Sequence, residues 1–263
     1  DFGPPDPKHQ MNPFRYASSN PAINMQWVDR LEEMDEPVSP WATSGTTEPP
    51  VYSSPATGMV KLVADPEEEA PADPPANAMS TSAASLAPLS QAAVEFGAVG
   101  LDWWSEALGY RPAFSLSVTV SDLPDGQLGA AGVTAYNTAG LPVAGSVHID
   151  ANADGHGWFI DPTPDRNEEF GRALAAAPLT ASGAGPAAGR YDLLTLLAHE
   201  IGHLLGFSRQ FAGFAGAVSA ESGAFASGDT LAWLDADLEH LDASRHPGAL
   251  MNRSLRRGER RLP

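Results

Sequence analysis

Apolar residues recur with helical spacing in the first strongly patterned segment of the chain, residues 89–108. Positions on one helix face return roughly every three to four residues, so this spacing predicts a helix, and Gly109 is a suitable stop. The apolar positions on this face are Ala92, Ala93, Phe96, Val99, Trp103 and Leu108. Residues 114–120 instead alternate between apolar and polar, which predicts a half-buried strand. A turn is expected at residues 123–126, whose sequence is Leu-Pro-Asp-Gly.

Shorter strands are expected downstream, at about residues 133–136, 146–150 and 157–160. A stretch rich in Gly, Ala and Pro follows at residues 181–190. It precedes a strongly apolar helix at residues 192–205. The order of helix, strands and long helix predicts an α+β domain of roughly 175 residues.

The beginning of the chain has a different composition. Of 24 prolines, 15 lie within residues 1–90, among Ser, Thr and acidic clusters. Such a segment buries too little apolar area to offset its ordering entropy. We therefore expect residues 1–85 to be a Pro-rich, disordered linker or propeptide-like segment, and residues 86–263 to form the folded domain. Within the linker, the helical spacing at residues 23–34 predicts a transient helix.

Charge and cysteine content argue against several functions. The chain has 15 Lys and Arg against 33 Asp and Glu, a formal net charge of −18, which repels phosphate backbones and anionic lipid. We therefore expect no nucleic-acid partner. There is no cysteine, so a disulfide, a thiolate zinc site and a cysteine nucleophile are excluded. No apolar stretch reaches the roughly 18 residues of a membrane-spanning helix.

The predicted second helix contains the sequence His-Glu-Ile-Gly-His at residues 199–203. Two histidines at i and i+4 lie on one helical face, so His199 and His203 can reach the same metal ion. Glu200 follows the first histidine and can take a proton from water at that metal. Burying two imidazoles and a carboxylate within an apolar helix is costly without a partner. The motif therefore predicts a zinc site.

A catalytic zinc site usually has three protein ligands and one open position. Residues 199–207, His-Glu-Ile-Gly-His-Leu-Leu-Gly-Phe, resemble the metzincin signature HExxHxxGxxH, in which the glycine breaks the helix with a positive φ. That pattern places a third histidine at position 209. This chain has Arg209 there, and a guanidinium cannot ligate zinc.

The resemblance resumes further along the chain, at Glu239-His240 and at the Leu-Met-Asn sequence that contains Met251. In bacterial matrixin-like metzincins the third histidine is followed by such an element, the Met-turn. If residues 208–238 are an inserted loop of 31 residues, joining Phe207 to Glu239 restores the Gly-x-x-His spacing. The zinc ligands that the resemblance implies are His199, His203 and His240, with Met251 packed beneath them.

Three other residues stay open as the third ligand. His246 lies six residues after His240, before a proline. Glu221 lies 18 residues after His203, close to the spacing of gluzincins, which use a downstream Glu. Asp229, in a Gly-Asp-Thr sequence, loosely resembles an aspzincin pattern.

Residues 145–164 and 258–263 also resemble bacterial matrixin-like domains, so the likeness covers about residues 86–263. It implies a twisted, mostly parallel sheet with an antiparallel edge strand, two long helices and a Met-turn. It also implies a secreted or cell-surface bacterial zinc endopeptidase, in which Glu200 activates zinc-bound water against a protein or peptide substrate held by strand pairing. The alternative is a catalytically decayed, protease-like binding or adhesion module of a secreted or surface protein, which Arg209 favours.

A second metal site is a weaker expectation. Alternating oxygen ligands followed by glycine, as in residues 150–155, are typical of the start of a calcium loop. The residues that would bind structural calcium are Asp150, Asn152, Asp154 and Asp161. His148 and His156 partly resemble a structural zinc site of matrixins. The other interpretation is a turn rich in Asp and Asn.

Two further clusters have simple structural interpretations. Trp103 and Trp104 are expected in the core or at a helix-packing surface. The basic residues near the C-terminus are expected to form a solvated face that balances the acidic domain. These are Arg253, Arg256, Arg257, Arg260 and Arg261.

Overall fold

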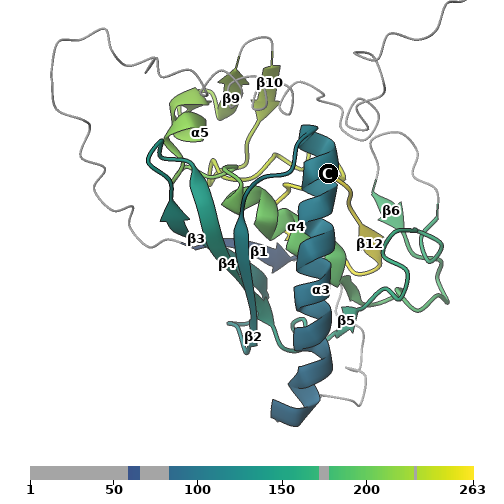
Figure 1. The fold of residues 1–263 in the computed structure, drawn as a ribbon. Coiled ribbons are helices and arrows are strands. Elements are labelled where there is room, and N and C mark those ends of the chain that lie inside the picture. Colours follow the sequence, from purple (N-terminus) through teal and green to yellow (C-terminus); the bar gives the residue numbers. More distant parts are fainter. Residues whose placement is uncertain (1–58, 66–82, 172–177, 228–229) are drawn as a thin grey trace, which may run out of the picture.

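The computed structural model describes residues 59–65, 83–171, 178–227 and 230–263 (Figure 1). The helix expected at residues 23–34 and most of the expected linker lie outside the described residues. Among those that are described, no helix has the length and apolar character needed to cross a membrane.

A five-stranded sheet forms the centre of the fold, in the order β11-β1-β3-β4-β2. Three of its strands cover the segments where strands were expected. The five strands are β1 (Val60–Ala64), β2 (Ser115–Ser121), β3 (Gln127–Tyr136), β4 (Pro142–Asp150) and β11 (Ser254–Leu255). In β2, Leu116, Val118 and Val120 are half-buried whereas the residues between them are exposed. This alternation indicates one covered and one open face.

The strand directions correct the expected topology. β11 is parallel to β1 and β2 is parallel to β4, whereas β3 is antiparallel to both β1 and β4. The sheet is therefore mixed, and its antiparallel strand lies in the middle rather than at the edge. The cause is β1, which comes from the segment expected to precede the domain. Val60 and Leu62 are buried and Lys61 between them is exposed, so this short segment has the alternation of a sheet strand. The folded unit thus begins upstream of residue 86.

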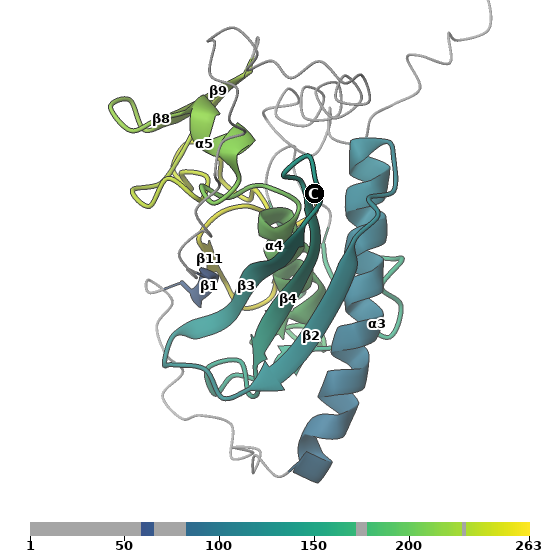
Figure 2. The same ribbon diagram turned by 60° about the vertical axis from the view of Figure 1, so that its left-hand side comes forward.

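Two long helices pack on the sheet and against each other, α3 (Ala83–Leu108) and α4 (Leu193–Leu204) (Figure 2). Both were predicted, although α3 begins earlier than expected. Every residue of α4 is buried, and its N-cap Asp192 accepts a hydrogen bond from the backbone N–H of Thr195. Trp104 is buried on α3 and donates from Nε1 to the carbonyl of Ala198 at 2.7 Å. The expectation that this tryptophan packs between helices is confirmed.

The segment expected to be an inserted loop has its own secondary structure. It contains α5 (Ala212–Ala217) and the antiparallel strands β8 (Val218–Ser219), β9 (Ala224–Ser227) and β10 (Thr230–Trp233). Phe214 and Phe225 are buried and stacked, with ring centroids 5.2 Å apart. They belong to the same apolar cluster as Ile201 of α4 and Met251. The apolar anchor of this segment is therefore shared with the core.

The C-terminal residues return to the start of α4. β12 (Glu259–Arg260) pairs with β6 (Leu179–Thr180), and β7 (Tyr191–Asp192), paired with β5 (Trp158–Phe159), leads directly into α4. Arg260 is 0% exposed and Arg261 is 6% exposed, so the expectation of a solvated basic face is wrong at these two positions. Arg253 and Arg256, by contrast, are exposed.

Arg260 can be buried because carboxylates surround it. Its Nε and Nη2 donate to the two oxygens of Asp192 at 3.0 and 2.8 Å, and its Nη1 donates to Asp161 at 2.6 Å. Burial by itself lowers the pKa of Arg260, but Asp192 and Asp161 hold that pKa above its usual value. A guanidinium matches a carboxylate in this two-point geometry, which lysine cannot reproduce. Residues 259–260 are thus bound through Arg260 to Asp192, the residue that caps α4.

Replacing this guanidinium should strongly destabilise the fold. Arg260→Ala leaves two buried carboxylates without their partner, so we expect the free energy of unfolding to fall by about 3–5 kcal/mol. Urea denaturation measures the change. Arg111→Ala, which removes an exposed ion pair with Asp102, is the matched control and should cost no more than about 1 kcal/mol. Similar losses in the two variants would contradict this account of the buried pair.

Candidate metal centre

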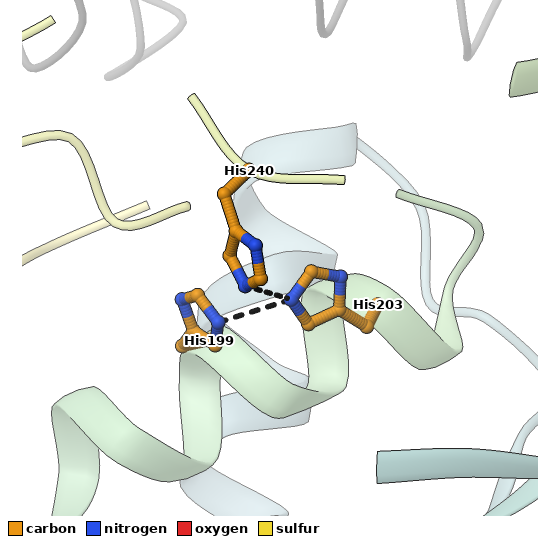
Figure 3. Close-up of side chains that lie close together, drawn as sticks. All are labelled: His199, His203 and His240. Carbon is orange, nitrogen blue, oxygen red and sulfur yellow. Dashed lines mark hydrogen bonds between the residues drawn. The ribbon is translucent and has the colours of Figure 1, made fainter. Parts of the chain in front are cut away.

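Three buried histidines converge beside α4 (Figure 3). His199 and His203 lie one turn apart on the helix, and His240 comes from the segment after β10. The Nε2 atom of His203 lies 3.0 Å from Nε2 of His199 and 3.2 Å from Nε2 of His240. None of the three residues is more than 2% exposed. The structure therefore brings together the three histidines that were predicted to share a metal.

The other ring nitrogen of each histidine faces an oxygen. Nδ1 of His199 lies 2.8 Å from the carbonyl of Leu250, and Nδ1 of His203 lies 2.6 Å from the carbonyl of Phe207. A carbonyl oxygen only accepts hydrogen bonds, so both Nδ1 atoms carry a proton. Nδ1 of His240 lies 2.6 Å from Oδ2 of Asp237. Burial by itself raises the pKa of Asp237, but the contacts with His240, with the backbone N–H of Glu239 and with Arg253 together outweigh it and hold that pKa at about 2, so this oxygen accepts as well.

With Nδ1 protonated, a neutral imidazole presents only a lone pair at Nε2. Burial and the neighbouring histidines lower the pKa of His199 well below its usual value, and burial and His240 lower that of His203 to about 3. The Nε2 lone pairs of His199 and His203 therefore face each other at 3.0 Å with no proton between them, and Nε2 of His240 lies 3.2 Å from that of His203. Nitrogens on a tetrahedral zinc ion lie ~3.3 Å apart, because each Zn–N bond is about 2.0–2.1 Å. The donor set and its spacing fit a metal ion.

A sharp chain reversal after α4 makes room for the third histidine. Gly206 has φ +119°, a conformation that glycine adopts readily, so the expected break of the helix at this residue is confirmed. The carboxylate of Glu239 then accepts hydrogen bonds from the hydroxyl of Ser208 and from the backbone N–H of Arg209. The two ends of residues 208–238 therefore meet, and His240 lies beside His203.

The other candidates for the third ligand are not brought to this cluster. Nε2 of His246 accepts a hydrogen bond from the backbone N–H of Trp233 at 3.1 Å, so its lone pair is already used. Glu221 is exposed in a turn of the inserted segment. Asp229 lies outside the described residues.

Met251 packs against the metal-binding turn of α4. A Cβ atom at Gly202 would lie 2.5 Å from its Sδ and 2.7 Å from Trp104, so only glycine lets these side chains approach the helix so closely. The residue before Met251 supplies the carbonyl that orients His199. These contacts agree with a methionine beneath the histidines, while the Met-turn of the family stays a prediction.

Glu200 lies on the side of α4 that faces the sheet. Its Oε1 accepts a hydrogen bond from the backbone N–H of Leu62 in β1 at 3.2 Å, and its Oε2 has no hydrogen-bond partner among the described residues. A Cβ atom at Gly129 of β3 would lie 3.1 Å from Oε1. Burial raises the pKa of Glu200 well above its usual value. The carboxyl group is therefore poised to hold a proton.

The proposed calcium ligands are engaged in other contacts. Asp150 accepts from the backbone N–H groups of Asn152, Asp154 and Leu123, which is a turn stabilised by an Asp side chain. Asp161 pairs with Arg260, as described above. Within the described part of the chain, only one group of three or more His, Asp or Glu side chains is close enough to share a metal ion, and it consists of the three histidines.

The two other histidines considered for a second metal also have separate partners. Nδ1 of His148 lies 2.9 Å from the hydroxyl of Thr119. The ring of His156 packs edge-on against Tyr191. They do not form the structural zinc site that the resemblance suggested.

Comparisons with family models, with curated proteins and with solved structures found no significant match to this chain. The interpretation of the site therefore depends on its geometry.

Two contributors to the site were missed by the sequence analysis. Asp237 lies three residues before His240, a spacing that does signal a side chain able to orient the imidazole. Leu62 contributes only its backbone N–H, and no side-chain pattern reports such a contact.

A divalent metal should bind this centre with one ion per chain. We expect His240→Ala to lose the ion, since two imidazoles remain, whereas His246→Gln should retain it because His246 contacts only protein groups. Elemental analysis after dialysis against a mild chelator measures the metal content. Equal metal in the wild type and in His240→Ala would exclude His240 as a ligand.

His246 should make stability depend on pH. Burial lowers its pKa from 6.5. A proton on Nε2 would also displace the hydrogen bond that this nitrogen accepts from the N–H of Trp233. Below pH 6.5 the unfolded chain then binds more protons at this residue than the folded chain does, so stability falls as the pH falls. We expect the wild type to lose more stability between pH 7 and 5 than His246→Gln does.

Urea unfolding of both proteins at the two pH values measures this difference. His148→Gln serves as the control, because the hydroxyl of Thr119 can either donate or accept and tolerates a change at the ring. Parallel pH profiles for the wild type and His246→Gln would contradict the prediction.

Proposed function

We propose that this protein is a zinc-dependent endopeptidase that acts on a protein or peptide substrate. The observation that carries the proposal is the convergence of three buried imidazoles through their Nε2 atoms. A tetrahedral arrangement of three nitrogen ligands with one open position is typical of catalytic zinc. When bound, zinc polarises a substrate carbonyl and lowers the pKa of water to about 7.

In this proposal Glu200 is the general acid and base. It follows the first zinc ligand on α4, and its carboxyl group is buried, with one oxygen that has no hydrogen-bond partner among the described residues. A carboxylate in such a dry environment has a high affinity for protons. Glu200 accepts a proton from the attacking water and later donates it to the nitrogen of the departing amine.

The hydrogen bonds at Nδ1 give the other residues of the site their roles. Leu250 and Phe207 fix the ring orientation of His199 and His203 through backbone carbonyls, and Asp237 does so for His240 through a carboxylate. Such partners hold each ring in one tautomer and make Nε2 a stronger ligand.

The alternative function, a decayed binding or adhesion module, was suggested by Arg209 in the place of a ligand. The contacts of Glu239 weaken that argument, because they bring His240 to the site and leave Arg209 with a backbone role only. An extracellular location in a bacterium is part of the proposal through the family resemblance.

Glu200→Gln tests the proposed chemistry. The amide cannot accept the proton, so we expect hydrolysis of an unstructured protein such as casein to fall by at least about 100-fold, while the bound zinc is retained. Glu221→Gln, which changes an exposed carboxylate of the inserted segment, should keep normal activity. Near-normal turnover in Glu200→Gln would exclude the proposed role.

A further inference from the structure

The strand β1 lies in the sheet as an extended peptide would lie in a groove. One of its edges pairs antiparallel with β3, and the other faces residues 253–255, which contain β11. On that second side, Val63 N–H donates to the carbonyl of Arg253 and Asp65 N–H donates to the carbonyl of Leu255, both at 3.1 Å. Main-chain hydrogen bonds therefore hold the segment from two sides.

This pairing is interrupted opposite Glu200. The register between β1 and β3 shifts between Leu62 and Val63. There the backbone N–H of Leu62 donates to the carboxylate of Glu200 at 3.2 Å instead of to a sheet carbonyl. The nitrogen of one particular peptide bond, between Lys61 and Leu62, thus lies within hydrogen-bond distance of the residue proposed as general acid.

The side chains of β1 alternate between the interior and solvent. Leu62 is 1% exposed and belongs to the main apolar cluster, together with Leu196 of α4 and Leu128 of β3. Val60 is also buried, whereas Lys61 is exposed. An extended peptide in this position therefore needs an apolar side chain on the carboxyl side of the bond nearest Glu200.

We propose that β1 is an intramolecular substrate of the metal centre and that the chain hydrolyses its own Lys61–Leu62 bond. Water adds to the carbonyl carbon of Lys61, and the bond from this carbon to the nitrogen of Leu62 breaks. One proton of the water passes through Glu200 to that nitrogen. The products are a new carboxyl group on Lys61 and a new amino group on Leu62, and no other reactant is needed.

This inference rests on the proposed function and extends it to a substrate class. Peptides that bind after β1 has left would pair with β3 and residues 253–255 in the same way. They would place Leu, or a similar apolar residue, immediately after the cleaved bond. While β1 stays in place, it blocks this groove to other chains.

The test follows the full chain by mass spectrometry and N-terminal sequencing after addition of one equivalent of Zn²⁺ to metal-free protein. We expect a new N-terminus at Leu62 in the wild type and none in Glu200→Gln. Lys61→Ala should still be cut, which distinguishes self-cleavage from a trypsin-like contaminant that cuts after lysine. Leu62→Glu should not be cut at this bond, because a carboxylate is costly in the apolar pocket.

A binding measurement tests the position of β1 without hydrolysis. A fluorescent peptide with the sequence of residues 57–66 is added to Glu200→Gln and to the double variant Glu200→Gln/Leu62→Glu. The double variant releases β1, so it should bind the peptide about tenfold more tightly or better. Circular dichroism checks that the double variant is folded. The cleavage experiment does not use the double variant, so its result does not depend on this check.

The outcomes separate this inference from the proposed function. If the zinc-loaded wild type hydrolyses casein while residues 61 and 62 stay joined, β1 is a permanent strand and the inference is wrong. If the chain binds zinc and hydrolyses neither casein nor itself, the proposed endopeptidase function is wrong, and the inference that rests on it is wrong as well. Equal peptide binding by the two folded variants would also overturn the inference.

Discussion

The metal centre depends on where three imidazole protons are held. Each Nδ1–H is bound by an oxygen from a different segment: the loop that ends α4, the turn before His240 and the loop before Met251. These three contacts turn the Nε2 atoms toward one another in a buried part of the fold. Buried lone pairs that face one another are electrostatically unfavourable, and a cation placed between them would relieve this cost.

The third histidine, His240, is distant in sequence from His199 and His203 but lies beside them in the fold. His203 and His240 are separated by 37 positions, yet Glu239 bonds directly to Ser208 and Arg209 at the other end of the intervening segment. The entropy of closing a loop grows only slowly with its length, and α5 with β8–β10 buries phenylalanines in the core in return. Residues 210–236 can therefore differ in length or content without moving the ligand, provided that Glu239 and Asp237 keep their contacts.

The sequence predicted the parts of this molecule that follow from short-range spacing. The two histidines and Glu200 were placed on a buried helix because the i, i+4 pattern lies within strong apolar periodicity, and Gly206 was expected to end it. The position of β1 was missed, since five residues in a Pro-rich stretch say nothing about which strand they will join. Arg260 was assigned to the surface because charged side chains are usually exposed. The sequence does not show that Asp161 and Asp192 would be buried beside it and neutralise its charge. His240 required a family pattern, because a ligand 37 positions away leaves no periodic trace.

The buried pair between Arg260 and Asp192 also determines when, during synthesis, the helix α4 gains its last stabilising contacts. A nascent chain that has emerged from the ribosome as far as His240 already contains every proposed metal ligand, but Asp192 at the start of the metal-binding helix still lacks its buried counter-charge. The ion pair with Asp192 can form only when residues 259–260 emerge and pair with β6. The buried counter-charge of Asp192 therefore reaches the helix only after all three histidines have been synthesised.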